Sequence, residues 1–202
     1  VYGAPAGRLA RVPVIVHTRH HGRNHVFKKR EISLTTAATK LVDRVVCVSE
    51  DSLTQGRIDG INPKQLMTIW NGIDITRFDY RGPNPAGPAV IVARLQPEKS
   101  IDTFIKAVPI ILREIPDYKV EIAGDGRCQD DLMRLTNDLQ ISEHVLFHGN
   151  VKDVPALLAR SSVMVLPSLT EGISLTLLEA MARGLPVVTT RVGGNPEVGF
   201  PN

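Results

Sequence analysis

The sequence predicts an α/β protein whose C-terminal half is a doubly wound parallel sheet of about five strands, and three observations lead to this fold class. The composition, 43% apolar and 22% charged over 202 residues, is that of a globular chain with a core. From Ala89 onward, short apolar runs alternate with stretches of helical periodicity, an order that gives parallel strands joined by right-handed crossovers. Two β-branched runs before Ala89 are each followed by a helical pattern as well.

The part of the chain before Ala89 holds fewer elements. In order, we expect a strand at Val12–Thr18, a helix at 26–41, a strand at Arg44–Ser49, a helix from Ser49 or Glu50 to about Gly60, and a short strand at Met67–Trp70. Residues 77–88 contain three prolines and two glycines with little apolar pattern, which is typical of a linker. We therefore predict an N-terminal domain over 1–72, a connection over 73–88 and a C-terminal domain over 89–202.

The C-terminal domain has the most regular pattern. Apolar runs that predict strands stand at 89–95, 119–124, 145–148, 163–167 and 186–190, and helical patterns stand at 100–114, 128–140, 153–160 and 174–183. Gly184 and Pro186 predict the end of the last of these helices.

Composition and missing motifs exclude several function classes. No apolar stretch approaches the roughly 18 to 20 residues that span a bilayer. Two cysteines form neither a spaced ligand set nor a disulfide framework, which favours a reducing cytoplasm. The sequence lacks a Walker phosphate loop, a dinucleotide-binding glycine motif and a serine-hydrolase elbow, and no two aspartates stand two residues apart, the spacing of a local metal-binding pair. The chain starts at Val1 rather than Met, and we expect it to be an internal piece of a longer protein.

The basic residues are concentrated at the N-terminal end. Residues 1–60 contain 10 Lys and Arg against 5 Asp and Glu, whereas residues 61–202 contain 14 against 16. A basic patch at 19–30 favours a phosphorylated acceptor, an anionic membrane surface or nucleic acid, or else is a solvated face. Phe27 is its one aromatic residue, so the stacking surface for single-stranded nucleic acid is missing.

The loop after the first predicted C-terminal strand, in the segment VARLQPEKS at 92–100, carries two cations. Open parallel sheets bind ligands at the carboxyl ends of their strands, where helix N-termini favour anions. Arg94 and Lys99 stand there just before Ser100, the expected N-cap, and suit a phosphate leaving group. The alternative is a surface ion pair of Lys99 with Glu98 or Asp102.

The segment at 167–190 places two glutamates around the start of a helix. Glu171 lies in a loop and Ser174 is the expected N-cap, while Glu179 shares a polar stripe of the helix with Arg183. Free amides near Ile173–Leu175 would hold a diphosphate without a metal. The alternatives are that Glu179 only pairs with Arg183, and that Glu171 is a solvated loop acid.

These motifs resemble a known enzyme family. The string EGISLTLLEAMA at 171–182, in which seven residues stand between two glutamates, resembles the signature of the retaining glycosyltransferases of family four, which have the GT-B fold of two Rossmann-like domains. In the family's order stand VSE at 48–50, NGID at 71–74, ARL at 93–95, EK at 98–99, IAGDG at 122–126, FHG at 147–149, LPS at 166–168 and GGNPE at 193–197. The resemblance covers nearly the whole chain from about Val12.

The resemblance implies sugar transfer from a nucleotide sugar to an acceptor hydroxyl, with retention and without a metal or other cofactor. By matching position, Arg94 and Lys99 would bind the diphosphate, Glu171 the sugar hydroxyls, and Glu179 the ribose. His20, rather than His21, would reach the reacting sugar from the N-terminal domain, which holds the acceptor. The other donor-binding residues implied are Gly149, Asn150, Val151, Gly172, Ile173, Ser174 and Leu175. A metal site formed by His17, His20, His21 and His25 is the rival interpretation of the histidines.

The acceptor stays open between a glycan, a lipid-linked compound and a small molecule, and no nucleic acid is expected. Location in the cytoplasm, with peripheral contact to the inner membrane face, fits the basic patch. The family's N-terminal domain begins earlier than this chain, so we expect these 202 residues alone to be unstable and inactive, with an incomplete N-terminal sheet. A non-catalytic nucleotide-sugar-binding fragment and a GT-B isomerase or phosphorylase are the alternatives.

Overall fold

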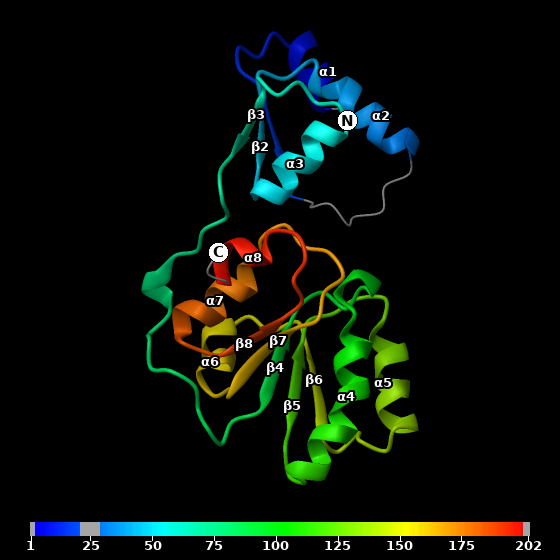
Figure 1. Cartoon of the computed structure of the whole chain (residues 1–202), viewed down its shortest axis with the longest axis vertical. Coiled ribbons are helices and arrows are strands. Elements are labelled where there is room, and N and C mark those ends of the chain that lie inside the picture. Colours follow the sequence, from blue (N-terminus) through cyan, green and yellow to red (C-terminus); the bar gives the residue numbers. More distant parts are fainter. Residues whose placement is uncertain (1–2, 21–28, 200–202) are drawn as a thin grey trace. The chain divides into compact units, whose positions relative to one another are not determined.

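The structure is a computed structural model that describes residues 3–20 and 29–199 (Figure 1). Contacts within the chain divide it into two compact units. The first unit holds the residues up to Asn71 together with 170–174 and those from Arg191 onward, and the second unit holds 72–169 and 175–190.

The first unit contains a three-stranded parallel sheet in the order β1-β2-β3. Its elements are α1 (Gly3–Leu9), β1 (Val16–Arg19), α2 (Lys29–Thr39), β2 (Arg44–Cys47), α3 (Glu50–Ile58), β3 (Leu66–Thr68) and α8 (Asn195–Gly199). Val16 lies opposite Arg44, and Val45 lies opposite Leu66. The core of this sheet is small and consists of Val42, Val45, Cys47, Leu53 and Ile61.

The first unit differs from the sequence expectation at its start. The first strand begins at Val16 rather than Val12, because Ile15 donates its amide to the Asp43 carboxylate at 2.8 Å and the residues before Val16 pair with no strand among the described residues. Helix α1 was not expected. Helix α3 does begin after Ser49, whose hydroxyl accepts from the amide of Ser52 at 3.0 Å. Residues 26–28 of the expected second helix lie outside the described residues.

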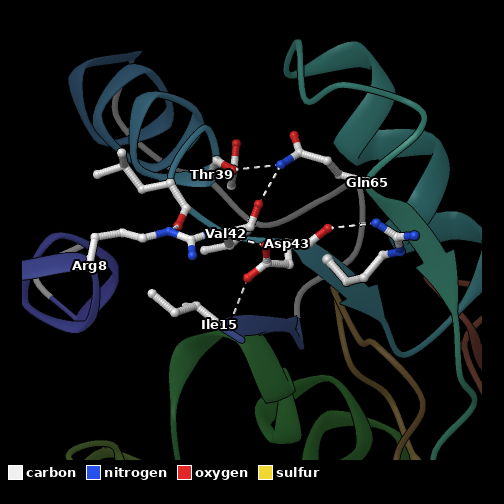
Figure 2. A network of polar contacts seen from close by, with 8 residues as sticks. Arg8, Ile15, Thr39, Val42, Asp43 and Gln65 are labelled. Atoms are coloured by element: carbon white, nitrogen blue, oxygen red, sulfur yellow. Dashed lines mark hydrogen bonds and ion pairs between the residues drawn. The ribbon is translucent and has the colours of Figure 1, made fainter. Parts of the chain in front are cut away.

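A polar network holds the turn between α2 and β2 (Figure 2). Arg8 of α1 donates to the Asp43 carboxylate at 3.0 Å. Gln65 donates its side-chain amide to the main-chain oxygens of Thr39 and Val42, at 3.0 and 2.6 Å. Side chains that are far apart in the sequence therefore satisfy the end of α2, which the small apolar core alone would hold weakly.

The second unit confirms the predicted five-stranded parallel sheet, whose order is β6-β5-β4-β7-β8. Its elements are η1 (Ile75–Arg77), β4 (Ala89–Val92), η2 (Pro97–Lys99), α4 (Ile101–Glu114), β5 (Val120–Ala123), α5 (Gln129–Asp138), β6 (Val145–Gly149), α6 (Val154–Ala159), β7 (Val163–Leu166), α7 (Leu175–Arg183) and β8 (Val187–Thr189). Helices α4 and α5 contact each other, as do α6 and α7 (Figure 1). Most bounds lie within one or two residues of the expected ones, although β4 ends three residues early.

The core of the second unit explains why its elements were predictable. Ile105 and Val108 of α4 and Ile91, Val120 and Ile122 of the sheet are fully buried in one cluster. Helix α7 ends where glycine was expected to end it, since Gly184 has φ +82° and Leu185 donates to the Ala180 carbonyl at 2.9 Å.

Candidate functional site

The loops that follow β4, β5, β6 and β7 lie together at the carboxyl edge of the five-stranded sheet. Main-chain hydrogen bonds run from Leu95 N to Asp125 O (2.7 Å), from Gly124 N to Gly149 O (2.7 Å) and from Leu169 N to Glu98 O (2.8 Å). Two of these bonds join different loops and the third joins the loop after β5 to the end of β6, so the edge is one connected surface. Ligands of open parallel sheets bind at such an edge.

Two glycines allow the loop after β5 to lie directly on the loop after β4. A Cβ on Gly124 would stand 1.9 Å from the oxygen of Ala93, and one on Gly126 would stand 2.4 Å from the oxygen of Leu95. Both glycines have positive φ, +134° and +152°. The backbone on both sides of Arg94 is therefore held by a neighbour that leaves no room for a side chain.

The two predicted cations stand in the loop after β4. Arg94 is exposed, and Lys99, the last residue of η2, is half-buried. Ser100 is the N-cap residue of α4, as predicted, but its side chain makes no capping hydrogen bond: its backbone is left-handed, with φ +47°, and its hydroxyl lies 2.8 Å from that of Thr103. An N-cap side chain reaches the helix amides from extended backbone, which Ser100 does not have. Asp102, one alternative partner of Lys99, is paired instead with Lys106 at 2.7 Å.

Glu179 lies half-buried on α7, between the fully buried Leu177 and Ala180. Burial raises the pKa of its carboxyl, and the positive charge of Arg77 opposes that rise. The alternative pairing with Arg183 is wrong in the described structure, because the Arg183 guanidinium donates to the main-chain oxygen of Asp79.

The loop at 170–174 is held by the segment that follows β8. Gly194 donates its amide to Gly172 O at 2.6 Å, and a Cβ on Gly193 would stand 1.8 Å from Glu171 O. Glu171 is only 8% exposed, so the alternative interpretation of Glu171 as a solvated loop acid is wrong. Of the remaining residues of the expected donor set, Ile173 and Ser174 are buried, Val151 is half-buried, Asn150 and Leu175 are exposed, and Gly149 has φ +63° with open space at its Cβ position.

His20 directly follows β1 and is exposed at the rim of a pocket of about 250 Å³ in the first unit. The pocket is also lined by His17 and by the ion pair of Arg19 with Asp59, whose side chains are 11% and 8% exposed. Burial is the main cause that lowers the pKa of His17. His21 lies outside the described residues, so the choice between it and His20 stays a prediction.

Further observations concern the metal alternative and the membrane. His25 lies outside the described residues, as does His21, and within 3–20 and 29–199 no three His, Cys, Asp or Glu side chains gather as a ligand set. Among the helices that the structure describes, none has the length and apolar character needed to cross a bilayer.

Sequence reasoning quoted the string GGNPE at 193–197 for the resemblance but gave Gly193 and Gly194 no role of their own, and it did not single out Arg77. Arg77 stands between the string NGID at 71–74 and the buried Phe78, and nothing in its spacing signals that its charge opposes the rise in the pKa of Glu179. The two glycines follow a predicted strand, a position that signals close backbone approach.

Comparison with known proteins gives two family matches. The model "Glycosyl transferases group 1" matches residues 75–199, and the model "Glycosyltransferase Family 4" matches residues 1–77. A curated relative from Escherichia coli, UDP-Gal:alpha-D-GlcNAc-diphosphoundecaprenol alpha-1,3-galactosyltransferase, is 30% identical over 96% of this chain and 56% of its own length. N-acetyl-alpha-D-glucosaminyl L-malate synthase of Bacillus anthracis is 39% identical over 76% of this chain and 43% of its own.

The chain thus spans about half the length of the curated relatives it matches. Among solved structures, Anabaena Alr3699/HepE in complex with UDP-glucose has a TM-score of 0.85 at 22% identity, over 96% of this chain and 58% of that one. This likeness agrees with the GT-B fold expected from the sequence. With a group 1 model over more than half of its residues and the family-four model over the rest, the chain belongs to the group 1 glycosyltransferases.

Proposed function

We propose that the protein transfers a sugar from a nucleoside-diphosphate sugar to an acceptor hydroxyl, with retention of the anomeric configuration and without a metal. The observation that carries the proposal is the connected edge of the five-stranded sheet, where the loop of Arg94 and Lys99 is hydrogen-bonded to the loops after β5 and β7. One relative whose name begins with UDP-Gal, and a structural neighbour in complex with UDP-glucose, support this donor class.

In this proposal each residue of the site has one role. Arg94 and Lys99 bind the diphosphate and neutralise the charge that grows on it as the glycosidic bond breaks. Glu179 accepts hydrogen bonds from the ribose hydroxyls, and Glu171 accepts them from the sugar. The segment from Gly172 through Ile173 and Ser174 to Leu175 offers amides to the phosphate, and Gly149, Asn150 and Val151 lie against the base.

The mechanism follows from the movement of charge. As the sugar leaves, positive charge develops at the anomeric carbon and negative charge on the diphosphate oxygen, and preorganised cations and amides stabilise the latter. They supply the charge that a metal supplies in other transferases. We propose that the acceptor hydroxyl attacks the face that the diphosphate leaves and passes its proton to the leaving phosphate, while His20 contacts the reacting sugar.

The N-terminal domain, which we assign to residues 1–72 with the connection at 73–88, would hold the acceptor. The names of the relatives include a lipid-linked diphosphate acceptor and a malate product, so lipid-linked and small acceptors both fit the family. The basic excess of residues 1–60 favours an anionic acceptor or peripheral contact with an anionic membrane surface on the cytoplasmic side.

Donor binding and turnover test the proposal in the complete protein that contains this chain. Calorimetry with UDP and GDP, followed by turnover of UDP- and GDP-linked hexoses, should show activity for one base. Lys99→Ala should weaken nucleotide binding by about tenfold or more, the loss expected for one charged hydrogen bond. Glu171→Ala should abolish turnover while nucleotide binding is kept.

The matched controls are Lys106→Ala and Glu114→Ala on α4, which should behave like the wild type. Product configuration, followed by proton NMR, tests retention, and turnover in excess EDTA tests metal independence. Intact activity in both Lys99→Ala and Glu171→Ala would contradict the site. Binding without turnover of any nucleotide sugar would instead support a non-catalytic binding protein, and conversion of the sugar without transfer would support an isomerase.

A further inference from the structure

The carboxylate of Glu197, on the short helix α8, accepts from three donors that stand much earlier in the sequence. Its oxygens accept from the main-chain amides of Glu50 and Asp51 at 2.9 and 3.0 Å, and from the indole N–H of Trp70 at 2.8 Å. Glu50 and Asp51 open α3, and the first amides of a helix need acceptors from outside it. Because a carboxylate at this end of a helix also gains from the helix dipole, Glu197 fixes α8 on α3 and on the segment after β3.

The residues just before Glu197 hold the loop that carries Glu171. Glu197 donates its amide to Gly194 O at 3.0 Å, and Gly194 donates its own amide to Gly172 O at 2.6 Å. A Cβ on Gly193 would stand 1.8 Å from Glu171 O. One on Gly194 would stand 2.3 Å from Gly172 O, so the two backbones touch and leave no room for a side chain. Two consecutive hydrogen bonds therefore link the backbone of Glu197 to the loop.

The loop also contacts the residues that follow the strands of the three-stranded sheet. A Cβ on Gly172 would stand 2.5 Å from the oxygen of His20, which directly follows β1. Asn71, in the segment after β3, donates its side-chain amide to Ile173 O at 2.9 Å. The loop is therefore held by these strand ends and by the residues after β8, and all of these residues belong to the first unit.

We propose that Glu197 is a positioning residue of the transfer reaction, which holds the loop of Glu171 where its carboxylate meets the donor sugar. This inference rests on the proposed function, in which Glu171 accepts hydrogen bonds from that sugar. Residues 170–174 form neither helix nor strand, so their contacts with neighbouring segments set where the loop lies. Loss of the Glu197 carboxylate releases one of these segments, and a shift of about 1 Å in a positioning group costs up to about a hundredfold in rate. The two cations proposed for the diphosphate belong to the second unit, so nucleotide affinity should change less than turnover.

The test compares Glu197→Ala and Glu197→Gln with Ser49→Ala as the control, in the complete protein. Ser49→Ala removes the hydroxyl that caps α3 at the amide of Ser52 but keeps the Cβ that lies next to Gly194. Glu197→Ala should lower kcat about fivefold to twentyfold, while the Kd for UDP or GDP, measured by calorimetry, changes by less than about threefold. Glu197→Gln keeps an acceptor oxygen and should restore part of the rate. Ser49→Ala should melt at a lower temperature, with kcat within about twofold of the wild type.

Hydrogen exchange of the ligand-free protein gives a readout that does not depend on nucleotide binding. In Glu197→Ala the amides of Glu50 and Asp51 lose their acceptor, and the amide of Gly194 should open more often from Gly172 O, so all three should exchange faster. In Ser49→Ala only the amide of Ser52 among these should exchange faster. The amides of β4 and β5, in the second unit, should keep the wild-type rates in both variants.

The outcomes distinguish this inference from the proposed function. If the wild type transfers no sugar from any nucleotide sugar, the proposed function fails and this inference with it. If the wild type transfers sugar while Glu197→Ala keeps its kcat, or loses kcat without faster exchange at Gly194, the role of Glu197 alone is overturned. An equal loss of kcat in Ser49→Ala would also overturn it, since the stability of α3 would then set the rate. A loss of nucleotide affinity as large as the loss of kcat would do the same, because Glu197 would then act on nucleotide binding.

Discussion

Replacing Gly124 by alanine should lower the free energy of unfolding of the second unit by about 3 to 5 kcal/mol. The φ of +134° at this position belongs to glycine, and an L residue there costs about 1 to 3 kcal/mol. The new Cβ would stand 1.9 Å from Ala93 O and 2.8 Å from Ala93 C. These are main-chain atoms, which cannot move away by a change of side-chain rotamer. Relief of this overlap would stretch the Ala93–Ala123 and Gly124–Gly149 hydrogen bonds, at about 1 kcal/mol each.

Urea unfolding, followed by far-UV circular dichroism and by hydrogen exchange of the β4 and β5 amides, measures this loss. Gly82→Ala is the matched control, since Gly82 also has a left-handed φ of +75° but nothing within 4 Å of its Cβ position. It should cost only about 1 kcal/mol, the backbone term alone. Equal losses in Gly124→Ala and Gly82→Ala would refute the reasoning, because close approach of the two loops would then contribute nothing.

Three other substitutions test local features. The free energy of unfolding of Ser100→Val should be about 1 to 2 kcal/mol lower than that of Ser100→Gly, because φ +47° disfavours a β-branched residue. Ser100→Val should therefore melt at a lower temperature, and equal melting temperatures would contradict this. The amide of Ile15 lowers the pKa of Asp43, so stability is lost as pH falls through the folded pKa, and Asp43→Asn should flatten this acid limb in a pH series of urea midpoints. Burial raises the pKa of Glu179, so its contribution to the stability of the fold is lost as pH rises through the folded pKa. Glu179→Gln should therefore have a higher melting temperature than the wild type at pH 7 while binding UDP or GDP less well. A lower melting temperature of Glu179→Gln would contradict the desolvation of this carboxylate.

The regular elements of the second unit were predictable because their signals are local. In residues 89–189 each buried strand and each amphipathic helix needs its apolar residues at a fixed period, and the period is visible in the sequence. The glycine after α7 likewise signals the end of that helix through its left-handed backbone.

The misses come from features that depend on distant partners. Helix α1 contains mainly small residues without an apolar period, and its Arg8 gains its partner Asp43 only in the folded chain. The first strand starts late because the Asp43 side chain takes the amide of Ile15. Ser100 occupies the N-cap position of α4 as expected, but it also ends η2 with a left-handed backbone, so its side chain makes no capping hydrogen bond.

The sequence by itself determined the alternation of strands and helices, the edge of the sheet at which ligand-binding loops gather, and the family to which those loops point. These follow from periodicity and from the chemistry of residues that lie close together along the chain. Only the tertiary structure decided which charge each carboxylate meets. Helix spacing offered Arg183 to Glu179, but packing turned the Arg183 guanidinium to the main-chain oxygen of Asp79, about a hundred residues earlier in the chain. Burial on α7 then raises the pKa of the Glu179 carboxyl, because a half-buried site of low polarity disfavours the charged form, and the depth of burial depends on elements that are distant along the chain.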